Sequence, residues 1–382
     1  MKFNPLLDRL KTYPMVEMKR RKQALIDAGR PVYDFSIGDP NDPTPAFIRE
    51  TIRDALPVVS AYPSVRGPKP LREAIAGYMG RRFGVSLDPA TQILPTSGSK
   101  EAVFHMPLLV VDPKADDNVV VFPDPGYPAY QRGTLFAGGE PYAQRLSDDF
   151  RQRPWELPRS ILERTRMIWI NTPHNPTGAV LDRDHLLRTW ELCQEHQILL
   201  VNDECYADIY QDRPPASLLE VATEGVVVLH SLSKRSGMTG YRSGFLAGDP
   251  RAIQALHDLR TNPGIAPQDF INAGAAAAWA EDTHADARRA VFQAKKTLMR
   301  DFFETIGVEV VASEATFYLW LRCAGGDDKA WALQLLEHGI VVTPGSALGV
   351  AGAGAGYVRV ALVPTLDECQ QAIQAWRTAA GA

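Results

Sequence analysis

Short apolar runs alternate with longer amphipathic segments over the middle of the chain. Four of the runs have the length of a strand and are rich in Val and Ile: NVVVFP (118–123), RMIWIN (166–171), ILLVND (198–203) and VVVLHS (226–231). Strands that are apolar on both faces are typical of a mainly parallel sheet with helices on each side. We therefore expect an α/β fold in this part of the chain.

The pattern changes towards the C-terminus. A long helical segment (288–307) leads to four shorter strand-like runs, EVV, TFYLWL, GIVVTPG and YVRVAL, and an amphipathic stretch (367–381) follows. These elements predict a second, smaller α+β domain. The first residues lie outside the alternating series, so we expect them to pack with it. The predicted division is 1–42 (an N-terminal arm and part of the small domain), 43–282 (a large domain) and 283–382 (the small C-terminal domain).

The composition narrows the class of protein. The 382 residues are 45% apolar and 23% charged, with a formal net charge of −4, which gives no reason to expect a nucleic-acid or membrane partner. The first residues, MKFNPLLDRLKTYPM, contain no unbroken apolar signal segment, and no stretch is long enough to span a membrane. The four cysteines are far apart, so we expect no metal site and no disulfide framework. We expect a cytoplasmic protein.

Each of the four apolar runs is followed by a loop rich in polar groups. The loops are DPGYP (124–128), NTPHNPTG (171–178), DECY (203–206) and SLSK (231–234). In open α/β sheets, ligands bind at the carboxyl ends of the strands. Turn chemistry alone would explain any one of these loops. Four of them with convergent polar groups predict a ligand site at this edge.

Lys234 lies among hydroxyls and basic residues at the end of a buried strand. Such surroundings can lower the pKa of its ammonium group, which an amine needs in order to condense with an aldehyde. The hydroxyls of Ser231 and Ser233 and the guanidinium group of Arg242 can hold a phosphate. The alternative is a surface cluster of basic residues, to which Arg235 would also belong.

Asp203 ends another buried strand. A carboxylate in that position is costly without a cationic partner, and a protonated pyridine nitrogen is such a partner. The alternative is an aspartate that caps the following segment. Asn175 is free to donate to a phenolate-like oxygen, although turn chemistry explains the rest of its loop.

A further candidate phosphate site lies in TSGSKEAV (96–103). Gly98, Ser99 and Lys100 open an apparent helix, whose free N–H groups suit an anion. The alternative is an ordinary Ser/Gly helix cap without a ligand.

Taken in order, NPTG, DECY and SLSK with a downstream arginine resemble the class I/II aminotransferases of pyridoxal-phosphate fold type I. The likeness runs from FSIGDPNDPTP (35–45) to YVRVALV (357–363). The resemblance implies a large cofactor-binding domain with a mostly parallel seven-stranded sheet and a small α+β domain. It also implies pyridoxal 5'-phosphate as cofactor and ping-pong transfer of an amino group between an amino acid and a 2-oxo acid.

The resemblance also implies roles for individual residues. Lys234 would form the Schiff base and move the proton, and Asp203 would pair with the pyridine nitrogen. Asn175 and Tyr206 would hydrogen-bond the O3′ atom of the ring, and Tyr127 would stack on it. The residues that fall where the phosphate is held are Gly98, Ser99, Lys100, Ser231, Ser233 and Arg242.

The substrate end is implied in the same way. Arg359 matches the arginine that clamps the substrate α-carboxylate, with Asn175 and the backbone of Gly38 beside the substrate. Tyr62 matches a tyrosine that reaches the phosphate of the neighbouring subunit, which implies a homodimer with shared active sites. The alternative is that Tyr127 and Tyr62 are packed aromatic residues.

Within the family, the sequence is most similar to the succinyldiaminopimelate aminotransferases of lysine biosynthesis, with Arg235 and Ser236 after the lysine the most discriminating feature. The expected donor is N-succinyl-LL-2,6-diaminopimelate and the expected acceptor 2-oxoglutarate. An aspartate or broad-specificity aminotransferase is an alternative, as is a carbon–sulfur β-lyase on the same fold. A non-catalytic regulator that binds the cofactor would need an attached DNA-binding segment, whereas we expect all of these residues to belong to the enzyme fold.

Two positions depart from the family pattern, and both are expected near the carboxylate end of the site. Ala315 stands where the family usually has proline, and Ala355 where an acidic residue often occurs. The far end of the substrate is unassigned, with candidates chosen by charge alone: Arg20, Arg21, Lys22, Arg66 and Arg260.

Overall fold

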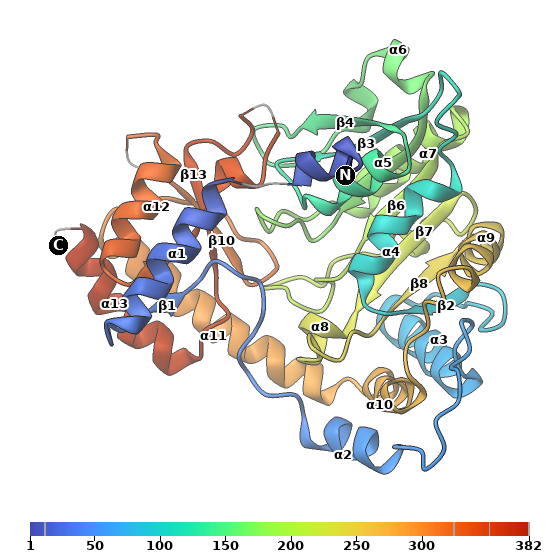
Figure 1. The fold of residues 1–382 in the computed structure, drawn as a ribbon, viewed down its shortest axis with the longest axis horizontal. Coiled ribbons are helices and arrows are strands. Elements are labelled where there is room, and N and C mark those ends of the chain that lie inside the picture. Colours follow the sequence, from blue (N-terminus) through green and yellow to red (C-terminus); the bar gives the residue numbers. More distant parts are fainter. Residues whose placement is uncertain (11–12, 324, 351, 381–382) are drawn as a thin grey trace.

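The computed structural model describes residues 1–10, 13–323, 325–350 and 352–380. The larger part of the molecule is built on a seven-stranded sheet with the strand order β2-β8-β7-β6-β5-β3-β4 (Figure 1). Its strands are β2 (Ile93–Thr96), β3 (Val119–Asp124), β4 (Glu140–Arg145), β5 (Thr165–Asn171), β6 (Leu199–Asp203), β7 (Val226–Ser231) and β8 (Gly244–Gly248). Only β8 runs antiparallel to its neighbours, β2 and β7. The predicted mostly parallel seven-stranded sheet is therefore confirmed.

Both faces of this sheet are covered, as the continuous apolar runs predict. Along β3, Val119 and Val121 pack into one apolar cluster, and Val120 and Phe122 pack into the cluster on the opposite face. The first cluster includes residues of α3 (Lys69–Phe83), α7 (Arg183–Glu195) and α10 (Asp269–Ala280). The second includes residues of α4 (Ser99–His105), α5 (Ala129–Phe136) and α9 (Pro250–Thr261).

Helix ends in this region follow ordinary capping chemistry. The side chain of Asp182 accepts a hydrogen bond from the first turn of α7, and that of Asp249 caps α9, where proline is the first residue. At the end of α3, Gly84 adopts a left-handed conformation with φ of 69°. The remaining short elements here are α2 (Ala46–Asp54), α6 (Arg159–Leu162), α8 (Leu232–Arg235), η2 (Met106–Leu109), η3 (Pro154–Glu156) and η4 (Leu218–Glu220).

The smaller part contains a four-stranded antiparallel sheet in the order β12-β13-β10-β9 and a parallel pair, β1 with β11. Its strands are β1 (Tyr33–Asp34), β9 (Val310–Ala312), β10 (Tyr318–Arg322), β11 (Ile340–Val341), β12 (Thr343–Pro344) and β13 (Tyr357–Ala361). Its helices are α1 (Tyr13–Asp27), α11 (Thr283–Thr305), α12 (Asp328–Glu337), α13 (Leu366–Ala380) and η5 (Gly345–Ala347), and η1 (Pro5–Leu10) lies near the N-terminus.

Two of the predicted short strands differ in detail. TFYLWL becomes a strand only from Tyr318, because Thr316 has a φ of 63° and cannot continue an extended chain. GIVVTPG forms two strands, since β11 pairs with β1 and β12 pairs with β13.

The residues of α1 and β1 join the C-terminal residues in space, whereas η1 contacts α5 of the larger part (Figure 1). Met18 and Phe35 belong to the same apolar cluster as residues of β10, β13 and α13. The domain boundaries themselves, at 42/43 and 282/283, remain a prediction. Among the described residues, none of the helices has the length and apolar character needed to cross a membrane.

Candidate active site

A cavity of about 490 Å³ lies at the carboxyl ends of β3, β5, β6 and β7, where residues 36–39 and β13 close it from the other side. All the predicted site residues except Gly98 and Tyr62 line it. These lining residues are Gly38, Ser99, Lys100, Tyr127, Asn175, Asp203, Tyr206, Ser231, Ser233, Lys234, Arg242 and Arg359. Residues from four loops thus meet at the carboxyl edge of the seven-stranded sheet, and Arg359 joins them from the four-stranded sheet.

Lys234 projects into the cavity from the four-residue helix α8. Ser231, the residue before the helix, caps it: its Oγ accepts a hydrogen bond from the backbone N–H of Ser233 at 3.1 Å. The Nζ atom of Lys234 donates to the backbone oxygen of Gly38. The pKa of Lys234 is lowered to about 8, chiefly by burial; Asp39 and Cys205 act to raise it, and the positive charges of Arg359 and Arg242 help to lower it. A larger neutral fraction near neutral pH makes this amine a competent nucleophile.

Asp203 ends β6 at the floor of the cavity and is 7% exposed. The hydroxyl of Tyr130 donates to its Oδ2 atom at 2.9 Å, and the backbone N–H of Cys205 donates to Oδ1 at 3.2 Å. Within the described part of the chain, no basic side chain forms an ion pair with it, and burial raises its pKa. A buried carboxylate without a cation beside it suits a cationic ring nitrogen from a ligand.

Arg359 and Asn175 are held together on the opposite wall. The Nη1 atom of Arg359 donates to the amide oxygen of Asn175 at 2.9 Å, and Nη2 donates to the backbone oxygen of Ser36 at 2.6 Å. Because its oxygen is used by Arg359, the amide of Asn175 has its nitrogen left as a donor. The Nε atom of Arg359 is buried and lacks a protein partner among the described residues. The guanidinium group therefore keeps donor capacity for a carboxylate.

Tyrosine side chains also line the cavity. The hydroxyls of Tyr206 and Tyr318 share a hydrogen bond of 2.8 Å, and burial raises the pKa of Tyr206 well above its ordinary value. The pKa of Tyr127 is also raised by burial. Both Tyr206 and Tyr127 are therefore neutral hydroxyl groups that can donate into the cavity.

The end of the cavity near α4 is built for an anion. Arg242 lies against Gly98, where an added Cβ would come within 2.3 Å of its Nη2 atom, and Gly98 has a φ of 77°. The positive φ favours glycine there, and a side chain would also displace the end of the Arg242 side chain. Gly98 thus lies behind the cavity wall and leaves room for the guanidinium group, while Ser99, Ser231 and Ser233 supply hydroxyls to the lining.

These observations fit pyridoxal phosphate. The anion end, the amine of Lys234 and the unpaired carboxylate of Asp203 match the phosphate, aldehyde and pyridine nitrogen of that cofactor in chemical kind.

Several residues of the site escaped the sequence analysis. Tyr130 binds Asp203, and Asn171 donates through Nδ2 to the backbone oxygen of Asp203 at 2.7 Å while its Oδ1 accepts from the backbone N–H of Asn175. Tyr318 lies under Arg359, with the guanidinium carbon 4.4 Å from the ring centre. Asn171 opens the NTPHNPTG motif, which was the available signal; for the two tyrosines the sequence offered none beyond their neighbours.

Other predicted residues lie away from this cavity. Tyr62 is fully exposed in the segment between α2 and α3. The five basic residues considered for the far end of the substrate do not line the cavity, whereas Arg132 of α5 does and was missed. Lys22 pairs with Asp34, and Arg260 pairs with Glu101. Neither Ala315 nor Ala355 lines the cavity.

Comparison with known proteins agrees with this geometry. The family model described as aminotransferase class I and II matches residues 30–375. An LL-diaminopimelate aminotransferase of Aquifex aeolicus is 36% identical over 94% of this chain and 95% of its own length. An aminotransferase structure from Neisseria meningitidis superposes with a TM-score of 0.89 at 30% identity, covering 99% of both chains.

A Thermus thermophilus structure, titled a probable N-succinyldiaminopimelate aminotransferase, has a TM-score of 0.89 at 27% identity and covers 96% of this chain and 100% of its own. With a family match over most of its length and a cavity that suits the cofactor, the chain belongs to the class I and II aminotransferases and is a pyridoxal-phosphate-dependent enzyme.

Proposed function

We propose that the amino donor of this aminotransferase is LL-diaminopimelate and that 2-oxoglutarate is the acceptor. The observation that carries the proposal is the similarity to curated relatives with that name, 36% and 35% identical over 94% and 98% of this chain. The donor differs from the one expected on the sequence alone, which carries an N-succinyl group. The Thermus thermophilus neighbour supports the succinylated compound as a second candidate.

The charges of the cavity are compatible with the unacylated donor. The far end of LL-diaminopimelate carries an ammonium and a carboxylate, and a succinyl group replaces that ammonium by an amide and a further carboxylate. Among the described residues that line the cavity, the charged ones not assigned to the cofactor or to the α-carboxylate are the acid Asp39 and the cation Arg132. One charge of each sign suits a zwitterionic end better than a group that carries two carboxylates.

We assign the chemistry to the residues of the cavity floor. When bound, the cofactor accepts into its ring the electron pair released as the substrate Cα–H bond breaks. Lys234 would hold the cofactor through its aldehyde group, and in its neutral amine form it would be the group that takes up and returns the proton of the substrate Cα. Its lowered pKa supports this role. Asp203 holds the proton on the ring nitrogen, which its buried position next to Tyr130 supports.

The remaining residues orient the two ligands. Asn175 and Tyr206 donate to the ring oxygen and Tyr127 packs against the ring. Arg359 binds the substrate α-carboxylate with two parallel hydrogen bonds. The planar guanidinium group allows this bidentate contact, which lysine makes poorly. Gly38 lies beside that carboxylate, where a side chain would collide with the Tyr318 hydroxyl at 2.3 Å.

The phosphate of the cofactor takes the anion end of the cavity. Ser99, Lys100, Ser231, Ser233 and Arg242 are its proposed contacts, with Gly98 leaving the space that Arg242 needs.

We further infer a homodimer in which the two active sites are shared. Tyr62 is far too exposed for a packed aromatic residue, and the same segment exposes Leu56, Val58 and Val59 by 56%, 103% and 80%. A run of exposed apolar side chains with a tyrosine at its end suits burial against a second copy of the chain. Tyr62 would then reach the phosphate of the partner subunit.

The test is a comparison of donors with purified, cofactor-loaded enzyme. Glutamate formed from 2-oxoglutarate is measured with LL-diaminopimelate, its N-succinyl derivative and aspartate. We expect kcat/KM for LL-diaminopimelate to exceed the others by at least about tenfold, equivalent to roughly 1.4 kcal/mol. A preference for the succinylated donor would replace the first candidate by the second, and release of pyruvate from cystathionine without any acceptor would indicate the lyase.

A further inference from the structure

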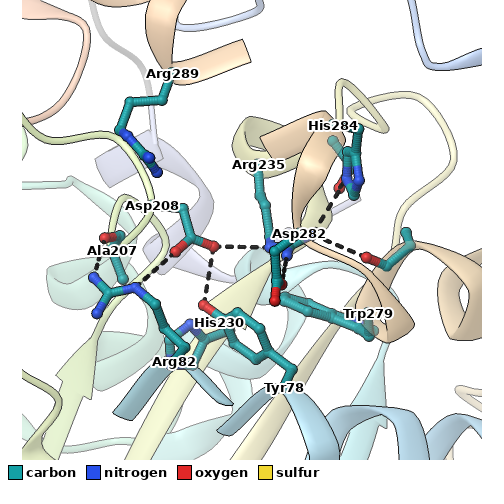
Figure 2. Close-up of polar contacts among 12 residues, drawn as sticks. Tyr78, Arg82, Ala207, Asp208, His230, Arg235, Trp279, Asp282, His284 and Arg289 are labelled. Carbon is teal, nitrogen blue, oxygen red and sulfur yellow. Dashed lines mark hydrogen bonds and ion pairs between the residues drawn. The ribbon is translucent and has the colours of Figure 1, made fainter. Parts of the chain in front are cut away.

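Arg235 follows Lys234 directly, and its side chain lies in a polar network with Asp208 and Asp282 (Figure 2). Its side chain is 3% exposed and does not line the cavity. One interpretation of the sequence places Arg235 in a basic surface cluster around the lysine. In the structure, Arg242 and Arg359 lower the pKa of Lys234, and Arg235 has other partners.

The first partner of Arg235 lies on the segment that follows β6. Its Nε atom donates to Oδ2 of Asp208 at 2.8 Å. Asp208 also receives a hydrogen bond from the hydroxyl of Tyr78 at 3.0 Å and an ion pair from Arg82 at 3.1 Å. Asp208 lies only a few residues after Asp203 and Tyr206 in the sequence. The ion pair between Arg235 and Asp208 therefore connects the segment that carries Lys234 to the segment that carries these two site residues.

The second set of partners lies where α10 ends and α11 begins. Arg235 donates to the backbone oxygens of Ala278 at 2.9 Å and Glu281 at 3.2 Å, and Nη2 contacts Oδ1 of Asp282 at 2.5 Å. The neighbouring Ser236 shares a hydrogen bond of 2.7 Å with His284 in the first turn of α11. Both residues after Lys234 are therefore fastened to this helix junction.

The guanidinium plane is also held by aromatic rings. Its central carbon is 5.0 Å from the centre of the Tyr78 ring and 5.2 Å from that of Trp279. Such contacts favour arginine, because the planar group can stack and still direct several donors to fixed acceptors. A lysine in this position would keep the positive charge but could donate to only some of the acceptors that Arg235 binds.

We propose that Arg235 is the positioning residue of Lys234: by binding Asp208 and the α10–α11 junction together, it seats helix α8 so that the lysine amine stays in the cavity. Helix α8 has four residues and little hydrogen bonding of its own. Its position must therefore come from tertiary contacts, and Arg235 makes most of the buried polar ones.

The consequence for Lys234 is electrostatic. Its amine keeps a lowered pKa chiefly because it is buried, and the groups that face it are Asp39, Cys205, Arg242 and Arg359. If α8 shifts, the amine gains water and its pKa rises towards the ordinary value of 10.5. The proposal builds on the role assigned to Lys234 but concerns where its amine lies, which can be measured without turnover.

The experiment titrates this amine in cofactor-free enzyme. Trace acetic anhydride is added at a series of neutral to alkaline pH values, and acetylation of Lys234 is quantified by peptide mass spectrometry. The decisive variant is Arg235→Lys, because it keeps the positive charge between Asp208 and Asp282, so that any shift comes from position. We expect the pKa of Lys234 to rise by about one unit, and by more in Arg235→Gln.

A matched control comes from the same junction. Arg81 pairs with Asp282 at 2.9 Å and donates to the backbone oxygen of Trp279 at 2.7 Å, but it lies in α3 and its side chain is 41% exposed. Arg81→Ala should leave the Lys234 titration unchanged. Thermal melting identifies which variants are folded, and if Arg235→Gln is not, Arg235→Lys decides alone.

An unchanged titration in a folded Arg235 variant, or an equal shift in Arg81→Ala, overturns the proposal. Its failure is distinct from failure of the catalytic assignment: removal of Lys234 tests the second, whereas the amine titration tests only the first.

Discussion

The cavity wall and the polar network around Arg235 and Asp208 are built from neighbouring residues, but their charged groups have opposite surroundings. On the cavity side, burial lowers the pKa of Lys234 and raises that of Asp203, which favours the neutral form of each group. Neither has an ion-pair partner in the described part of the chain. In the network, Arg235 and Asp208 are paired, and Arg235 and Arg82 help to hold the pKa of Asp208 below its ordinary value. The reactive groups are the unpaired ones, and fully paired groups hold them in place.

The largest expected effect lies on the cavity side. Lys234→Ala removes both the nucleophile and the group that moves the proton, so amino transfer in a single turnover should slow by at least about 10⁴-fold. Rapid mixing of the cofactor-loaded protein with donor measures this rate. Lys69→Ala, which removes an exposed lysine, should keep the wild-type rate. A Lys234→Ala rate within a factor of ten of the wild type would remove the lysine from the mechanism.

The second effect lies in the network and concerns stability. Asp208→Asn leaves Arg235 and Arg82 without their shared carboxylate and should lower the free energy of unfolding by about 3–5 kcal/mol, measured with urea at neutral pH. Because the folded-state pKa of Asp208 is lowered from 3.8, its contribution is present above that value and is lost as the pH falls through the folded-state pKa. The difference between variant and wild type should therefore shrink only in strong acid.

An exposed pair provides the comparison. Asp117 lies 3.4 Å from Arg166 and is half exposed, so Asp117→Asn should change stability by less than about 1 kcal/mol. If Asp208→Asn and Asp117→Asn lower the free energy of unfolding equally, the buried network contributes no more to stability than an exposed ion pair.

The smallest effect sharpens the boundary between the two regions. Tyr130→Phe removes the hydroxyl that donates to Asp203 and should cost about 1 kcal/mol, roughly fivefold in the rate of proton transfer. The fold should be unaffected, because the ring still stacks on Trp169. The rate is measured with α-deuterated donor, and Tyr142→Phe is the control. An effect of equal size in both variants would mean that the hydroxyl does not act through Asp203.

Much of the floor of the cavity could be predicted because its residues close buried strands. Apolar runs predict such strands, and parallel pairing brings the carboxyl ends of the strands to one edge of the sheet. The sequence alone therefore predicted that Asp203 and Lys234 lie close together, at the ends of β6 and β7. The family pattern then predicted Arg359, although β13 belongs to a different sheet.

The supporting contacts could not be predicted in this way. Tyr130 reaches Asp203 only because α5 packs over that face of the sheet, and Tyr318 reaches Tyr206 only because β10 starts after the left-handed Thr316. The direction of Arg235 depends on the α10–α11 junction, which is distant in sequence. Contacts of this kind follow from packing between elements and leave no local periodicity to read.

The reversed direction of β8 sets how the ligand site is encoded along the chain. Since β7 and β8 are antiparallel, the connection between them starts and ends at the same edge of the sheet. A parallel neighbour would instead require a crossover to the opposite edge. One uninterrupted peptide, residues 231–244, can thus contribute an amine, two hydroxyls and a guanidinium group to one cavity. A segment made of β7, β8 and the peptide between them would therefore bring a large part of the binding site with it if it were transferred to another protein.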